Sequence, residues 1–433
     1  MPQEITHLDH PIDVMYLIHK AIRAEARRTR QAAEQLEIGG NFKTFINAFY
    51  QWATALGYHE ETEYKYLIPH LSQSLPARHN ETGHKELLEG LEELQICLHE
   101  ELGRTIVIPR TQRQLFGKVI NLLIAQADLL EEEEDTLLPV IRRQMRPEQQ
   151  LEIIRRLLLD PDSEDDRWML DWMEQHLSET ERQVLASLVA RFDELDASLP
   201  PEAASASASG SRLPADVELE SAALATPTGF DHPIDIMMLL HKALNVDAWR
   251  AETIAEHLEV GETFEHFIEA FESWMRALNF HADMEDAHMT PLLPDSPLAR
   301  DNEAGHARLA QRAEEIQRHL QELEHQTVTT RTRRRLYGQV VALRIDQDDH
   351  FEEEVDLVLP LLREHLTMEQ QLEVVSHLLH DTHASGSETG WVLEWLSHDL
   401  TDNERQSLAG LTAQLPEKRD KALGAVLLMT PPE

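Results

Sequence analysis

The stretch LDHPIDVMYLIHKAIR at residues 8–23 returns as FDHPIDIMMLLHKALN at residues 230–245. Both stretches place apolar side chains three and four residues apart, which is the spacing of one face of an α-helix. Each stretch carries two histidines, and the second of them lies among these apolar residues, His19 in the first stretch and His241 in the second. The sequence therefore predicts an amphipathic helix that occurs twice, each time with an imidazole in an apolar setting.

The repetition extends over nearly the whole chain. GNFKTFINAFYQWATALGYHEETEYKYLIPHL is matched by GETFEHFIEAFESWMRALNFHADMEDAHMTPLL, and RQLFGKVINLLIAQADLLEEEEDTLLPVIR by RRLYGQVVALRIDQDDHFEEEVDLVLPLLR. Near the end of each copy, WMLDWMEQHLSETERQVLASL is matched by WVLEWLSHDLTDNERQSLAGL. Internal similarity of this extent indicates two copies of one domain.

A segment of different composition separates the copies. Residues 200–229 are rich in Ser, Ala and Pro and cannot bury enough apolar surface to fold, which predicts a flexible linker. We therefore expect domains at residues 1–199 and 230–420, followed by a short tail at residues 421–433.

Each copy is expected to be all-helical. Apolar residues recur at helical spacing over four long segments and several shorter ones, and no stretch alternates as a strand would. Pro69, Pro139, Pro291 and Pro360 stand near the expected helix ends, where a missing amide hydrogen costs least. Short loops between long amphipathic helices favour antiparallel packing. The predicted fold is two tandem up-down four-helix bundles, each with additional C-terminal helices.

Composition excludes several classes of protein. A formal net charge of −40 over 433 residues argues against nucleic acid and against an anionic membrane surface as partners. The single cysteine, Cys97, excludes a disulfide framework and a cysteine-rich zinc or iron–sulfur site. No apolar run is long enough to span a membrane, and the first residues do not form a signal peptide. We expect a soluble, cytoplasmic protein.

In the second copy, four histidines and two glutamates occur at spacings that suit a metal site. Two His-x-x-x-Glu pairs each lie on one face of a helix, and two further helices add one imidazole each. One such pair is common on solvated helices, but burying all six groups without a cation would cost several kcal/mol for each unpaired group. The candidate ligands are His241, His281, Glu285, His306, His350 and Glu354.

These ligand types favour iron. Imidazole binds Fe, Zn, Cu or Ni, and a carboxylate can bridge two ions. Six protein ligands underfill two six-coordinate irons and leave positions for a bridging oxo or hydroxo group and for dioxygen, whereas zinc usually closes a site with four ligands. The sequence predicts a di-iron centre in the second domain, and it leaves zinc and manganese open as alternatives.

The same segments resemble the hemerythrin family, in its His-His-Glu cation-binding branch. The likeness is carried by LLHKAL around His241, FHADMEDAHMTPLL with His281 and Glu285, GHARL with His306, and DHFEEEVDLVLPLL with His350 and Glu354. The end of each copy is also similar to the hemerythrin repeats of plant iron-sensing ubiquitin ligases. This resemblance implies a di-iron centre that binds dioxygen, or that reports iron and oxygen together. Ligase activity is not implied, because those enzymes carry zinc-binding RING-type domains and this chain has one cysteine.

The first copy departs from the pattern at one position. Its candidate ligands are His19, His59, Glu63, His84 and Glu133. Where His350 would repeat it has Leu129, whose alkyl side chain cannot bind a metal. Glu132 and Glu60 are placed to substitute in part, whereas Asp128 lies about 100° around the helix from Leu129. Three states remain open for the first domain: an asymmetric pair of irons, a single iron, or an empty site kept for structure.

Three functions compete on the sequence alone. The leading hypothesis is a module that binds dioxygen reversibly or senses oxygen and iron, because imidazole-rich coordination favours binding over strongly oxidising chemistry. The second is a di-iron oxidoreductase, either a ferroxidase or a reductase of peroxide or nitric oxide, although no separate acid–base or nucleophile pattern is visible. The third is a helical scaffold with a structural metal, whose tail LGAVLLM could dock on a protein partner or pack on the second domain. Whether the two domains pack on each other stays open.

Overall fold

The computed structural model describes residues 4–70, 75–101, 106–192, 230–293, 297–323, 325–381 and 390–415. Within these ranges every regular element is a helix and none is a strand, which confirms the all-α class. The chain divides into two compact units, Met1–Ala223 and Leu224–Glu433, called unit 1 and unit 2 below. No helix in the described part of the chain has both the length and the apolar character needed to cross a membrane. The expected linker and tail lie outside the described residues.

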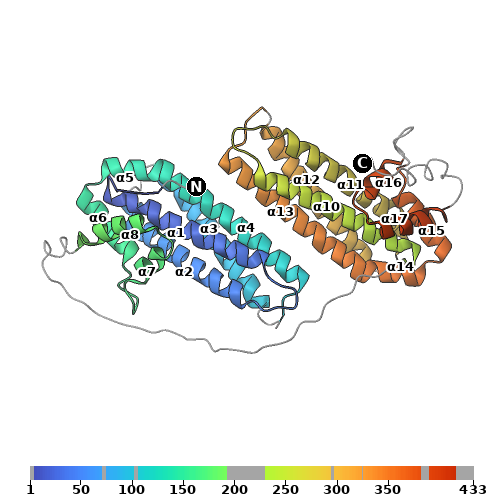
Figure 1. Cartoon of the computed structure of the whole chain (residues 1–433), viewed down its shortest axis with the longest axis horizontal. Helices are drawn as coiled ribbons and strands as arrows, with labels where there is room; N and C mark the ends of the chain where they lie inside the picture. The colour runs from blue at the N-terminus through green and yellow to red at the C-terminus, as the bar shows by residue number, and fades with distance from the viewer. Residues whose placement is uncertain are drawn as a thin grey trace. The chain divides into compact units, whose positions relative to one another are not determined.

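Unit 1 is built around four long helices (Figure 1). These are α1 (Met15–Glu34), α2 (Lys43–Tyr66), α3 (Leu75–Glu101) and α4 (Pro109–Glu132). Helices α1 and α3 each contact both α2 and α4, so the four enclose a common interior. The shorter elements are η1 (Pro11–Val14), η2 (Ile68–His70), η3 (Glu133–Leu137), α5 (Leu138–Gln144), α6 (Pro147–Leu158), α7 (Trp168–Glu174) and α8 (Glu179–Val189).

Unit 2 repeats this order of elements. Its long helices are α10 (Met237–His257), α11 (Glu265–His288), α12 (Pro297–Glu322) and α13 (Thr330–Glu353). Helices α10 and α12 each contact both α11 and α13. The shorter elements are η4 (Pro233–Ile236), η5 (Thr290–Leu292), η6 (Glu354–Val358), α14 (Leu359–His365), α15 (Met368–Leu378), α16 (Trp391–Ser397) and α17 (Asp402–Thr412).

Large aromatic side chains on the second long helix of each unit fill the interior beside the candidate ligands. In unit 2, Phe271 and Trp274 are almost fully buried, and burying a side chain of this size contributes about 2–3 kcal/mol. The Trp274 indole N–H donates a hydrogen bond of 2.7 Å to Gln347 on α13. In unit 1, Trp52 donates a matching bond of 2.6 Å to Gln126 on α4. Each bond ties two long helices together, and its tryptophan lies about two turns before the histidine ligand candidate of the same helix.

The C-terminal helices are fastened to the first long helix of their unit by equivalent ion pairs. At the start of α17, Glu404 accepts a 2.7 Å hydrogen bond from the backbone N–H of Thr401, which closes a capping box. The same carboxylate lies 2.7 Å from Lys242 Nζ on α10. In unit 1, Glu181 on α8 and Lys20 on α1 form the corresponding pair at 2.6 Å. The short helices therefore cover one end of each group of long helices.

Candidate metal centres

Unit 2 brings all six predicted side chains together in its interior. One imidazole comes from each long helix, and the two carboxylates come from α11 and from the start of η6. All six side chains are buried, with exposed fractions of 7% or less. They form two overlapping groups of four, which are His241, His281, Glu285 and Glu354, called position A, and Glu285, His306, His350 and Glu354, called position B.

At position A, two imidazoles face different carboxylates. His241 Nε2 lies 3.1 Å from Glu354 Oε2, and His281 Nε2 lies 3.0 Å from Glu285 Oε1. The two imidazole rings meet edge to face, with 5.1 Å between their centroids. The two nitrogens therefore converge on one point from helices α10 and α11.

Position B uses the remaining oxygens of the same two glutamates. His306 Nε2 lies 3.2 Å from Glu285 Oε2, and His350 Nε2 lies 3.2 Å from Glu354 Oε1. Each carboxylate thus presents one oxygen to position A and the other to position B. This is the arrangement that a carboxylate adopts when it bridges two cations.

The donor atoms of unit 2 are arranged to bind cations and not to form hydrogen bonds with one another. The Nε2 atoms of all four histidines and all four carboxylate oxygens are buried, and none of them makes an aligned hydrogen bond. Burying such groups without a partner costs about 1–3 kcal/mol each. A set of imidazole nitrogens and carboxylate oxygens matches the ligand preference of iron, zinc or manganese. The residues present therefore fit a pair of metal ions.

Charge in unit 2 is balanced between these groups. Burial would lower the pKa of His306, but its contacts with Glu285 and Glu354 raise that pKa to about 11. Burial would raise the pKa of Glu354, but the facing imidazoles, His350 foremost, hold it well below its ordinary value. Burial lowers the pKa of His241 below its ordinary value. The low pKa of Glu354 keeps its carboxylate negatively charged in the interior, where this charge can balance a bound cation.

Residues behind the ligands fix two of the imidazole rings. His306 Nδ1 lies 2.8 Å from Asp286 Oδ1, and since a carboxylate can only accept, the ring donates through Nδ1 and turns Nε2 toward position B. The His241 ring stacks on Phe351, with centroids 4.0 Å apart and planes 2° from parallel. The sequence did not predict Asp286 or Phe351 as partners, because each lies on a different helix from the imidazole ring that it contacts.

A cavity reaches position B from outside unit 2. It has a volume of about 310 Å³, and its lining includes His350, Asn302 and Leu357. Asp301 and Arg308 also line it, and both are exposed. Among the described residues, His350 is the candidate ligand that this cavity touches. A small molecule could approach the site from this side.

A π-helical turn positions the last glutamate ligand in each unit. Elements η3 and η6 are π-helices that begin at Glu133 and Glu354, and the N–H of the residue five positions later donates to the carbonyl of each glutamate. Such turns are rare and occur mainly at functional sites. Pro139 and Pro360 follow, each close to the start of the next α-helix, where a residue without an N–H is tolerated. The sequence pointed to a helix end here but not to the π turn.

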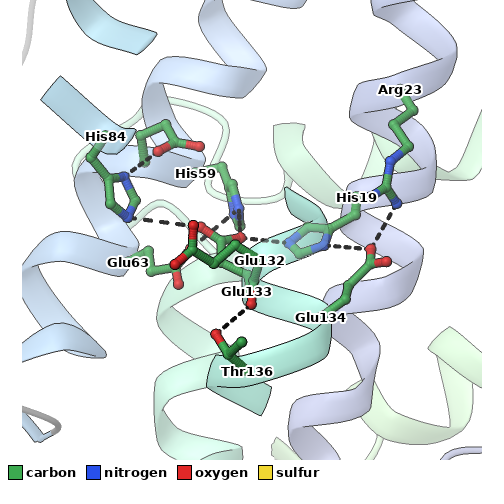
Figure 2. A network of polar contacts seen from close by, with 10 residues as sticks. His19, Arg23, His59, Glu63, His84, Glu132, Glu133, Glu134 and Thr136 are labelled. Carbon is green, nitrogen blue, oxygen red and sulfur yellow. Dashed lines mark hydrogen bonds and ion pairs between the residues drawn. The ribbon is translucent and has the colours of Figure 1, made fainter. Parts of the chain in front are cut away.

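Unit 1 gathers its five predicted ligands into two smaller groups. These are His19, His59 and Glu133, and Glu63, His84 and Glu133. Figure 2 shows these side chains pointing toward one another from α1, α2, α3 and η3. Glu133 divides its oxygens as Glu354 does, with Oε2 3.2 Å from His19 Nε2 and Oε1 3.8 Å from His84 Nε2. Three donors per group can still hold a metal ion, with more positions left open.

Leu129 occupies the place of the missing imidazole and is buried, with an exposed fraction of 3%. Of the carboxylates considered as substitutes, Glu60 is buried and its Oε2 contacts His84 Nδ1, on the far side of that ring from the group. Glu132 and Asp128 are half-buried and belong to neither group of candidate ligands. Glu60 therefore supports a ligand instead of replacing His350.

The electrostatic setting of unit 1 differs from that of unit 2. Burial raises the pKa of Glu63 to about 8, and burial lowers the pKa of His59 well below its ordinary value. His19 Nδ1 contacts Glu134 Oε1 at 2.8 Å, and Arg23 approaches the same oxygen at 2.7 Å (Figure 2). With fewer imidazoles facing its carboxylates, unit 1 favours the neutral forms of Glu63 and His59.

Comparison with known proteins adds no identification. The chain matches no family model, no curated protein and no solved structure. What can be concluded about function therefore rests on the geometry of the two sites.

Proposed function

We propose that unit 2 is a hemerythrin-like four-helix bundle that holds a pair of iron ions and binds dioxygen, either reversibly or as an oxygen and iron sensor. The observation that carries this proposal is the division of oxygens in Glu285 and Glu354, each of which faces both histidine pairs. In a site for a single ion, neither carboxylate would have to face two positions.

The number of donors favours binding of an additional small ligand. Each position has two imidazole nitrogens and two carboxylate oxygens, and a six-coordinate iron ion accepts two more ligands. The iron pair, once bound, supplies the electrons that dioxygen needs for tight but reversible binding. The chain contributes a buried interior that limits access of water and a cavity that leads to His350.

A di-iron oxidoreductase is the competing proposal. Such an enzyme needs a group that delivers or removes protons beside the substrate. The buried titratable groups at positions A and B are themselves candidate ligands, and Asp286 is occupied with His306. Asp301 and Glu353 line the cavity that leads to His350 and belong to neither position, so these are the carboxylates that such an enzyme would use.

For unit 1, we propose an asymmetric metal site of lower affinity. The group that corresponds to position B lacks an imidazole, because Leu129 stands in the place of His350, and the group that corresponds to position A lacks the second carboxylate. The outer partners of His19 and His84 are carboxylates, which raise the basicity of an imidazole ligand and partly offset the missing donor.

Anaerobic loading of the full chain with ferrous ion, followed by metal analysis and absorption spectra under cycles of dioxygen and argon, tests the proposal. We expect two irons in unit 2 and bands in the near ultraviolet that appear with dioxygen and disappear under argon. His350→Ala is the control and should lose iron from position B. Sustained consumption of ferrous ion or peroxide would favour the oxidoreductase. A well-folded protein that binds no iron would refute the proposal.

A further inference from the structure

The backbone of α12 passes unusually close to the ring of His350. Gly305 is buried on α12, and a methyl group placed on it would come within 2.7 Å of His350 Cε1 and closer still to Nδ1. Carbon atoms in contact prefer about 3.5–4.0 Å. Only glycine leaves room for the imidazole at this point.

The close approach acts on the Nδ1–Cε1 edge of the ring, next to the nitrogen that faces position B. The Nδ1–Cε1 edge of His350 packs against Gly305, while Nε2 points at Glu354 Oε1 at 3.2 Å. The edge-to-face contact with the His306 ring, at 4.7 Å between centroids, supports the imidazole from another side. The α12 backbone therefore limits how far the ring can move on its Nδ1–Cε1 side.

We infer that Gly305 is a positioning residue for position B: it lets α12 approach α13 closely enough to fix the place of the His350 imidazole, whose Nε2 would hold the second metal ion. This inference rests on the proposed metal pair. A ligand atom must lie within about 0.2 Å of its ideal distance, whereas a methyl group on Gly305 would displace the ring by several times that amount.

In unit 1, the backbone of α3 passes similarly close to residue 129, which is a leucine instead of a histidine. A methyl group on Gly83 would come within 2.8 Å of Leu129 Cδ1, the far end of a flexible side chain. The space that admits an imidazole in unit 2 is thus already present in unit 1. Glu63, His84 and Glu133 already form a group beside it. Leu129→His should therefore complete a four-donor position in unit 1, equivalent to position B of unit 2.

Iron content of the full chain after anaerobic loading with ferrous ion tests this inference. Gly305→Ala should lose about one iron per chain, as His350→Ala does, while Gly83→Ala should lose none because Leu129 can shift. In a His350→Ala background, Gly305→Ala should cause no further loss, since the ring that it would displace is gone. A purely structural role for Gly305 predicts the same loss of stability in both backgrounds, which thermal unfolding of the metal-free variants measures.

A second set of variants tests the same inference in unit 1. Leu129→His should gain about one iron per chain, and adding Gly83→Ala should remove that gain. The inference is overturned if Gly305→Ala retains wild-type iron content, or if Gly83→Ala does not affect the Leu129→His variant. If Gly305→Ala alone does not fold, the Leu129→His pair of variants still decides the question. If instead His350→Ala retains all its iron, the proposed metal pair itself is wrong.

Discussion

At the scale of single residues, Glu285 and Glu354 differ from the histidines because each belongs to both candidate metal positions. A histidine offers one Nε2 atom to one position, whereas Glu354 places Oε2 3.1 Å from His241 and Oε1 3.2 Å from His350. Loss of one imidazole should therefore weaken one position, and loss of one carboxylate should weaken both.

Glu354→Gln should remove both irons from unit 2. The amide keeps the shape of the side chain but has no negative charge and only one oxygen, so it cannot join two cations. Metal analysis after anaerobic loading would measure the loss, with His350→Ala losing about one ion for comparison. Asp356→Asn is the matched control, because Asp356 lies in the same π turn but is exposed. Loss of a single iron in Glu354→Gln would contradict a bridging role.

At the scale of secondary structure elements, the cavity lined by α12, α13 and η6 is the route by which we expect small molecules to reach position B. Leu357 lines this cavity and is 47% exposed, so a larger side chain there can narrow the opening without entering the core. The equivalent residue of unit 1 is Thr136, which is exposed on η3.

Leu357→Trp should slow the association of dioxygen with the iron-loaded protein. An indole over the opening would have to move aside, and a cost of about 1.4 kcal/mol for that movement slows the reaction by about tenfold. Stopped-flow absorption measures the rate, and metal analysis checks that iron content is unchanged. Thr136→Trp is the control in unit 1. An unchanged association rate in Leu357→Trp would show that dioxygen enters by another route.

The attachment of α17 to α10 should depend on pH. Burial would raise the pKa of Glu404, but its contacts with Lys242 and Thr401 lower it below the ordinary 4.5. Because this pKa is depressed in the folded state, the carboxylate stabilises the fold above pH 4.5 and loses that contribution as the pH falls through its folded-state value.

Glu404→Gln should therefore cost about 1 kcal/mol of unfolding free energy at neutral pH and much less in acid. Urea unfolding of the metal-free protein at both pH values measures the difference. Glu394→Gln, at an exposed position of α16, should be neutral at either pH. A cost of the same size in acid would mean that the Glu404 charge is not the cause.

The sequence predicted the helical class and the side chains that the structure groups together better than it predicted their surroundings. The all-α class is confirmed, and His281 and Glu285 could be paired in advance because a four-residue spacing is a property of a single helix. The approach of Gly305 to His350 depends instead on the distance between two helices, which no spacing within one helix encodes. Glu60 was considered as a ligand because of its neighbourhood in sequence, and only the packing of α2 against α3 places it behind His84.

At the scale of the whole molecule, the two units carry candidate sites with unequal numbers of donors in the same order of elements. Each unit has its own core and its own candidate ligands. Unit 2 offers four donors at each position and unit 1 offers three. We therefore expect metal to stabilise the two units separately and to different extents.

Removal of metal should lower the unfolding temperature of unit 2 more than that of unit 1. A ligand at one thousand times its dissociation constant stabilises the folded state by about 4 kcal/mol, which for a unit of this size is a shift of about 8–16 °C. Calorimetry of the iron-loaded and chelator-treated full chain measures both transitions. Glu354→Gln should abolish the shift of one transition and Glu133→Gln that of the other, which assigns each transition to its unit. Equal shifts in both transitions would contradict the ranking, because the missing imidazole at Leu129 would then carry no energetic consequence.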